Sequence, residues 1–254
     1  MIQPTSIGDL IRIGSKNDGG YAIPAETNSD LLISFGLGDD WKFENEMLKK
    51  KLIKNFYIYD HTVDLLSLLY KTLERAKTFY KLKPIIYRSK VFLLYFIDFT
   101  LLHKNHIRKE ITGNLSNQHQ TNLHEIVNDV VAKSRFILKV DIEGAEYKII
   151  DSIVFFSKQI DLLIIEFHGV IRNYDQFEQK LQLLLQKFLI VHVHANNFGT
   201  IEKSGFPDVC EITFTPIGKY KAVGLVAKLP IEKLDSPSSP TKPEYSINFE
   251  RPNH

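Results

Sequence analysis

The sequence predicts an α/β fold built on a doubly wound, mostly parallel sheet with a helical insert. Short apolar runs with the length and β-branched character of buried strands alternate with segments of helical spacing. Several of these runs end directly in a glycine or a polar residue, a pattern typical of strands that lead into a ligand site. The length of 254 residues suits one large domain. We expect this domain to cover residues 1–227, with a helical insert at about 64–105 and an extended tail over 228–254.

The composition is that of an ordinary globular protein and excludes several classes. Hydrophobic residues make up 44% of the chain, and the formal net charge of +2 gives no argument for a nucleic-acid-binding surface. Cys210 is the single cysteine, which excludes an intrachain disulfide and disfavours a structural zinc site. The longest apolar stretch, residues 91–102, is too short to span a bilayer and contains Asp98. We expect a cytoplasmic protein without stable membrane insertion, in which this stretch could support a homo-oligomer or peripheral membrane contact.

Two turns near the start of the chain contain glycine. Asp18-Gly19-Gly20 reads as a chain reversal into a short strand that begins at Tyr21, and by itself it is only a turn. Residues 31–35 form the next strand candidate, and they run into Gly36 and Gly38. A strand followed by such a turn and a helix lets the backbone approach a bound cofactor, because a Cβ at either glycine would clash.

The residues around this second turn limit the kind of cofactor. The third glycine of the dinucleotide fingerprint is absent, and Asp39 and Asp40 follow the turn instead. Carboxylates at a helix N-terminus repel a pyrophosphate but suit a ligand with an ammonium group. The following strand, residues 55–59, ends at Asp60, where an acidic residue usually binds ribose hydroxyls. Capping of the next helix is the alternative role for Asp60.

Residues 64–102 are apolar with a helical period. This segment is longer than one crossover helix needs, so we expect an inserted helical unit that forms a lid or a partner surface.

Residues 135–150 carry the highest density of acidic groups beside a strand. Residues 136–140 read as a buried strand, and Asp141 follows it directly. Glu143 and Glu146 follow within five residues, and their simplest roles are helix capping and solvation. Asp141 is harder to explain in this way, since it ends a buried strand, so we expect it at a ligand site.

Two later strands also end in polar groups. Residues 161–165 run into Glu166, with His168 two positions further and on the same side. Residues 189–193 reach His194, Asn196 and Asn197. The carboxyl ends of parallel strands lie along one edge of the sheet, so these groups should converge. A carboxylate with an imidazole suits proton removal from an alcohol, or the binding of a divalent cation that acidifies a hydroxyl.

A series of motifs in order resembles a known family. The motifs are DGGY, SFGLGDDWKFE, YIYD, ILKVDIEGAEY, IIEFHG, HVHANN and DVCEITF, which lie between about residues 10 and 216. They resemble the FkbM-type S-adenosylmethionine-dependent methyltransferases. The resemblance implies a Rossmann-like fold of the class I methyltransferase type, S-adenosylmethionine as cofactor, and O-methylation of sugar or polyketide-derived alcohols.

The resemblance also implies residue roles. Gly36 and Gly38 would lie against the methionine part of the cofactor, Asp39 near its amino group, and Asp60 at the ribose. The other implied cofactor-binding residues are Asp18, Gly19, Tyr21, Asp141 and Glu143. The implied catalytic residues are His168, His194, Glu166 and Asp141, and the implied substrate-binding residues are Glu143, His168, Asn196 and Asn197. The ligands of a divalent Mg or Mn ion would be Asp141, Glu166 and His194.

The expected activity is O-methylation of a carbohydrate hydroxyl, with a nucleotide-activated sugar for a surface polysaccharide as the acceptor. A nicotinamide-dependent dehydrogenase on a similar sheet is one alternative, and a non-catalytic module whose helical insert binds a partner is another.

Overall fold

A seven-stranded sheet forms the centre of the molecule. The computed structural model describes residues 3–76, 82–131, 134–201 and 207–248. The strand order is β11-β12-β10-β9-β4-β5-β6, and all neighbours are parallel except at β12. The strands are β4 (Leu31–Phe35), β5 (Asn55–Tyr59), β6 (Asn105–Ile107), β9 (Phe136–Val140), β10 (Ile160–His168), β11 (Phe188–Ala195) and β12 (Val209–Pro216). The predicted doubly wound, mostly parallel α/β sheet is confirmed.

The direction of winding reverses between β4 and β9. The chain adds β5 and β6 on one side of β4, and then crosses back to add β9 and β10 on the other side. Phe35, Tyr59 and Val140 pair at the same level, so these three strands end together. Ligands bind at such a switch point, outside the carboxyl ends of the strands.

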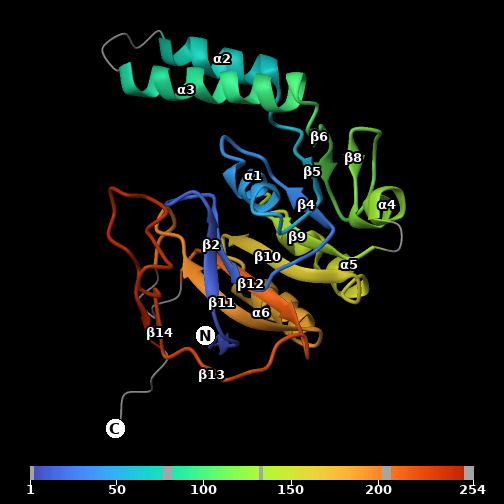
Figure 1. Cartoon of the computed structure of the whole chain (residues 1–254), viewed down its shortest axis with the longest axis vertical. Coiled ribbons are helices and arrows are strands. Elements are labelled where there is room, and N and C mark those ends of the chain that lie inside the picture. Colours follow the sequence, from blue (N-terminus) through green and yellow to red (C-terminus); the bar gives the residue numbers. More distant parts are fainter. Residues whose placement is uncertain (1–2, 77–81, 132–133, 202–206, 249–254) are drawn as a thin grey trace.

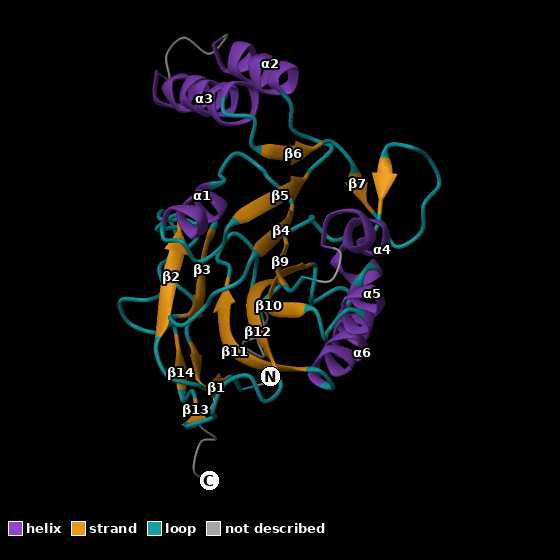
Figure 2. Ribbon diagram, turned by 45° about the vertical axis from the view of Figure 1, so that its right-hand side comes forward, coloured by secondary structure: helices purple, strands orange, loops and turns teal. Residues whose placement is uncertain are grey.

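Both faces of the sheet are covered. Figure 2 shows α4, α5 and α6 stacked on one face, with α1 and the β2–β3 hairpin on the other. The first group comprises α4 (Leu123–Ile126) with the π-helical turn η2 (Val127–Val131), the 3-10 turn η3 (Glu146–Lys148), α5 (Ile150–Phe155) and α6 (Tyr174–Leu185). The second group comprises α1 (Lys42–Lys49), β2 (Leu10–Gly14) and β3 (Gly20–Pro24). All five residues of β4 and of β9 are buried, because each strand packs on both sides.

A helical hairpin projects from the domain between β5 and β6 (Figure 1). It consists of α2 (Leu65–Ala76), α3 (Leu82–Tyr95) and the π-helical segment η1 (Phe96–Leu101). Asp98 fastens its base, because its carboxylate accepts hydrogen bonds from Trp41 at 2.6 Å and Asn45 at 3.1 Å and pairs with Lys104 at 2.7 Å. Among the described helices, none has the length and apolar content needed to cross a bilayer.

The last part of the described chain packs against the domain. β14 (Lys228–Leu229) pairs with β15 (Ile247–Asn248), and Leu229 and Ile247 are buried in the core. Four further short strands complete the list of elements: β1 (Thr5–Ser6) pairs with β13 (Gly224–Leu225), and β7 (Glu110–Ile111) pairs with β8 (Gln120–Thr121). Residues 228–248, called the tail below, therefore form a folded cover and are not a free extension.

Candidate active site

The glycine turn after β4 meets the loop after β9. Gly36 has a φ of 91°, and a Cβ there would lie 1.8 Å from the backbone oxygen of Asp141, so that only glycine fits. Gly38 has a φ of 56°, yet a Cβ there would meet nothing within 4 Å. The turn therefore leaves open space beside Gly38, as the binding of a ligand against its backbone requires.

Two cavities adjoin at this turn. One has a volume of about 230 Å³ and is lined by the predicted residues Asp18, Gly19, Tyr21 and Asp39, among others. The second has a volume of about 190 Å³, and apolar side chains of Tyr59, Ile111 and Ile142 contribute to its wall. The residues that line both cavities are Gly36, Asp60, Thr62, Asp141 and Glu143. The ends of β4, β5 and β9 thus converge around a divided hollow with one acidic and one more apolar part.

The first cavity is strongly acidic. Its lining includes the carboxylates Asp18, Asp39, Asp40, Glu44, Asp60, Asp141 and Glu143. Lys139 is the only cation among its lining residues, and it is buried 3.8 Å from Glu44 and 3.9 Å from Asp141. Burial lowers the pKa of Lys139, but the Glu44 and Asp141 carboxylates outweigh this and raise it above its usual value. Lys139 is therefore charged, and it offsets only part of the negative charge.

Two features of the cavity mouth modify this charge. Desolvation, together with the charges of Glu211 and Asp141, raises the pKa of Asp18 to about 6. The residue as a whole is nevertheless exposed. Asp39 is paired with Arg88 of α3. The predicted contact of Asp39 with an amino group thus competes with a guanidinium that is already in place.

Asp60 holds the glycine turn. One of its carboxylate oxygens accepts from the backbone N–H groups of Leu37 at 2.9 Å and Gly38 at 3.3 Å, and the other accepts from the N–H and hydroxyl of Thr62, both at 2.7 Å. Desolvation raises the pKa of Asp60, but these hydrogen bonds lower it below the usual range overall. Asp60 is therefore an anion that lines both cavities, where the predicted ribose contact requires it.

His168 is positioned by a buried carboxylate. Its Nδ1 lies 2.9 Å from Oε1 of Glu146, which is fully buried and also accepts from the Gly144 N–H at 3.0 Å. The Nε2 atom lies 3.5 Å from Glu143 and 3.9 Å from Glu166. Burial lowers the pKa of His168, but the hydrogen bond and charge of Glu146 raise it above 6.5 overall. Nδ1 is thus held by Glu146, whereas Nε2 faces the acidic loop after β9.

His194 is not part of this group, which corrects its predicted roles as base and metal ligand. β12 lies between β10 and β11, so His194 is three strands from Asp141, or about 14 Å at the usual strand spacing. Its Nδ1 lies 3.3 Å from Glu211, and its Nε2 lies 3.3 Å from Glu244 of the tail. Burial lowers the pKa of His194, but these carboxylates raise it to about 10. The imidazole is therefore a buried cation and has no capacity to accept a proton near neutral pH.

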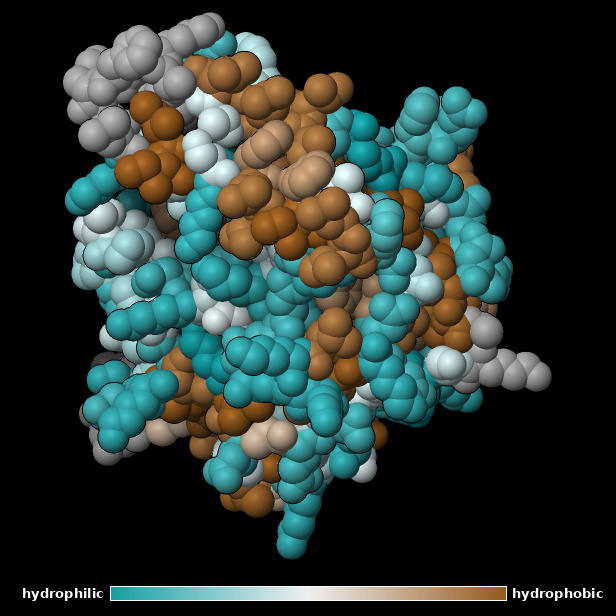
Figure 3. All heavy atoms as spheres, turned by 45° about the horizontal axis from the view of Figure 1, so that its top comes forward, coloured by the Kyte–Doolittle hydropathy of each residue, from teal (hydrophilic) through white to brown (hydrophobic). Residues whose placement is uncertain are grey.

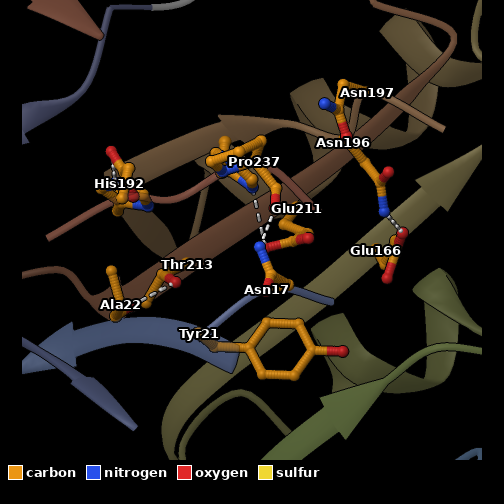
Figure 4. Close-up of polar contacts among 12 residues, drawn as sticks. Asn17, Tyr21, Ala22, Glu166, His192, Asn196, Asn197, Glu211, Thr213 and Pro237 are labelled. Carbon is orange, nitrogen blue, oxygen red and sulfur yellow. Dashed lines mark hydrogen bonds and ion pairs between the residues drawn. The ribbon is translucent and has the colours of Figure 1, made fainter. Parts of the chain in front are cut away.

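The two asparagines after β11 have structural contacts. Asn196 donates to Glu166 at 2.7 Å, whereas Asn197 points away from it (Figure 4). Asn197 is fully buried, donates to three backbone oxygens of the tail, and accepts from the Ser239 N–H at 2.6 Å. The predicted substrate contact of Asn197 is wrong, because all of its polar atoms hold the tail.

The predicted metal set is not assembled either. Within the described residues, the groups of three with ligand atoms within 4.8 Å of one another are Asp141–Glu143–His168 and Asp18–Glu166–Glu211. Desolvation and the charges of Asp141 and Glu211 raise the pKa of Glu166 well above its usual value. The set of Asp141, Glu166 and His194 fails because β12 separates its last member from the other two.

Three site residues were missed in the sequence. Lys139 lies within an apolar run that reads only as a strand, although a lysine in a buried strand is itself a signal of a charge partner. Glu146 was expected to be solvated, but it is fully buried and orients His168. Glu211 faces Glu166 across the β10–β12 pair, which depends on a strand order that no local pattern reveals.

Comparison with known proteins places the chain in a family. Among solved structures, the chain is similar to M. capricolum TrmK in complex with the cofactor product S-adenosyl-homocysteine, with 15% identity and a TM-score of 0.33. That alignment covers 76% of this chain and 65% of the other. No curated protein matches the chain. The family described as the methyltransferase FkbM domain matches residues 21–198, from β3 to the turn after β11. Because this match covers more than half of the sequence, the chain belongs to the FkbM methyltransferase domain family.

Proposed function

We propose that the chain is an S-adenosylmethionine-dependent O-methyltransferase that acts on a carbohydrate hydroxyl, with a nucleotide-activated sugar for a surface polysaccharide as the acceptor. The observation that carries the proposal is the position of His168, whose Nδ1 is held by Glu146 and whose Nε2 lies 3.5 Å from Glu143, a residue that lines the acidic cavity. Membership of the FkbM methyltransferase family supports the reaction class. The carbohydrate acceptor rests on the resemblance described for the sequence.

The cavity suits this cofactor better than a dinucleotide. S-adenosylmethionine supplies an activated methyl group on a sulfonium and also carries an ammonium group, so that two cationic centres enter the site. The carboxylates of Asp18, Asp60 and Asp141 line the cavity and favour such charges, whereas they repel a pyrophosphate. Asp60 faces both cavities and would hold the ribose, and the apolar wall of the second cavity would take the adenine.

His168 and its partners would remove the proton. Methyl transfer needs an acceptor oxygen aligned with the methyl group and freed of its proton. In the neutral imidazole, Nδ1–H donates to Glu146 and Nε2 is the free acceptor. As Nε2 takes the proton, the buried Glu146 carboxylate stabilises the resulting charge. Glu143, whose side chain is 85% exposed, would meet other hydroxyls of the sugar at the opening.

His168→Ala tests the proposal directly. We expect the wild type to form S-adenosylhomocysteine from S-adenosylmethionine when one member of a panel of glycosides and sugar nucleotides is added. The variant should lose at least 100-fold in turnover, as loss of a general base usually costs, while its binding of S-adenosylmethionine is unchanged. His119→Ala, at an exposed histidine, is the matched control. Full turnover in His168→Ala, or methyl transfer only to nitrogen or carbon acceptors, would contradict the proposal.

A further inference from the structure

The helical hairpin exposes apolar side chains that its own packing leaves uncovered. On α2 these are Leu66, Leu69, Tyr70 and Leu73, with exposures of 40–74%, at the spacing of one helical stripe. On α3 they are Ile86, Tyr87, Leu93 and Leu94, with exposures of 40–64%. Figure 3 shows apolar side chains gathered over this end of the molecule. Contiguous apolar surface of this kind marks an interaction site.

Lysines lie within the same face of α3. Lys83 and Lys90 are exposed. Ile86 lies three residues after Lys83 and four before Lys90, and Leu93 and Leu94 lie three and four residues after Lys90, which places all five on one side of the helix. Val91 and Tyr95 of the same helix are buried. Lys90 and Leu94 adjoin this packed side, because they line a cavity together with Val91 and Trp41. The exposed face of α3 therefore combines apolar side chains with cations.

The hairpin is basic, whereas the chain as a whole is nearly neutral. Residues 65–102 contain seven lysines and arginines against two carboxylates, compared with 32 against 30 for the whole sequence. Of the two carboxylates, Asp98 is buried and paired, and Glu74 is half-buried and interacts with a neighbour. Among the described side chains of this segment, no carboxylate is exposed. The nearest negative groups belong to the domain, where Asp39 pairs with Arg88 and lines a cavity together with Lys90.

We propose that the α2–α3 hairpin docks on the surface of an anionic lipid bilayer. Leucine, isoleucine and tyrosine side chains would enter the boundary between headgroups and acyl chains, and Lys83 and Lys90 would extend to the lipid phosphates. The charge pattern distinguishes a bilayer from a second copy of the chain, since a two-fold interface would place this basic face against itself.

Vesicle sedimentation tests the proposal. We expect the wild type to sediment with phosphatidylcholine vesicles that contain 30% phosphatidylglycerol, to bind much more weakly to phosphatidylcholine alone, and to be released by 0.5 M salt. Each lysine near an anionic surface contributes about fivefold in partitioning, so Lys83→Glu/Lys90→Glu should lose at least about 25-fold. Lys158→Glu/Lys187→Glu makes the same charge change at exposed positions outside the hairpin and should bind like the wild type.

The apolar part of the face is tested separately. Leu93→Ser/Leu94→Ser should lower partitioning several-fold, whereas Ile217→Ser/Leu225→Ser, at equally exposed apolar positions elsewhere, should not. Thermal unfolding checks that all four variants are folded. Absence of wild-type binding to anionic vesicles, or equal loss in the variants and their controls, would overturn the proposal. So would a wild-type dimer in analytical ultracentrifugation that Leu93→Ser/Leu94→Ser converts to a monomer.

Discussion

Glu146 and His168 form a pair in which the carboxylate sets both the orientation and the basicity of the imidazole. Glu146 has no exposed surface, and its Oε1 accepts from His168 and from the loop N–H groups of Ile142 and Gly144. A buried negative charge at 2.9 Å stabilises the protonated ring, which explains why the pKa of His168 is raised despite burial. Activity should therefore increase with pH through a value above 6.5.

Glu146→Gln tests this pairing. The neutral amide removes the charge that raises the pKa of His168, so the inflection in the pH dependence of kcat/KM should move to lower pH. The maximal rate should fall about tenfold or more, because the protonated imidazole loses its partner. Glu178→Gln, at an exposed glutamate on α6, is the control. An unchanged inflection in Glu146→Gln would show that another group titrates.

The sequence allowed some of these residues to be placed and not others. Gly36, Asp60 and Asp141 directly follow strands and His168 is the last residue of β10, so alternation of strands and helices was enough to bring them to one edge. Glu146 could not be predicted as the partner of His168, because their contact depends on the path of the loop after β9.

At the scale of elements, the tail explains the polar residues at the end of β11. His192 lies 3.1 Å from Asp235, His194 lies 3.3 Å from Glu244, and Asn197 bonds to backbone oxygens between residues 239 and 243. Asn17 donates to Pro237 at 2.7 Å, which brings the tail to the turn beside Asp18. These polar groups resemble a catalytic set in the sequence, but they fasten one segment to another.

His194→Gln should destabilise the fold in a pH-dependent manner. The variant leaves Glu211 and Glu244 beside a neutral side chain, and the loss at pH 7 should be about 2–3 kcal/mol. The folded-state pKa of His194, about 10, exceeds the unfolded value, so its contribution is complete below about pH 6.5 and is lost as the pH rises through about 10.

Urea unfolding at several pH values measures this effect. The difference in unfolding free energy between the wild type and His194→Gln should decrease from pH 7 to pH 10, and His119→Gln, at an exposed histidine, should show no difference. A difference that grows with pH would mean that His194 is neutral in the folded protein.

Local sequence patterns predicted the helical insert but not the order of the last strands in the sheet. The helical period over residues 64–102 predicted a helical insert, and α2, α3 and η1 occupy that segment. The pairing of β12 between β10 and β11 had no local signal, because antiparallel insertion depends on long-range contacts. That insertion is what separates His194 from Asp141 and Glu166.

At the scale of the whole molecule, the central sheet, the glycine turn after β4 and the β2–β3 hairpin together form one acidic site. Figure 2 shows the β2–β3 hairpin alongside the sheet, and Thr213 of β12 donates to Ala22 of β3 at 2.8 Å. This contact helps place the turn at Asp18 over the strand ends, so that carboxylates as far apart in the sequence as Asp18 and Glu143 share one cavity. The charge of that cavity, more than the fold, argues for a cationic cofactor.

Calorimetric titration of the wild type and Asp60→Asn with S-adenosylmethionine, and separately with NAD(H), tests this account most directly. We predict micromolar binding of S-adenosylmethionine and none of NAD(H). Asp60→Asn should weaken binding about tenfold, because a charged acceptor of hydrogen bonds is lost, and Asp9→Asn, at an exposed aspartate, should bind normally. Binding of NAD(H) alone would contradict the account and indicate a dehydrogenase, and binding of neither would indicate a partner-binding module.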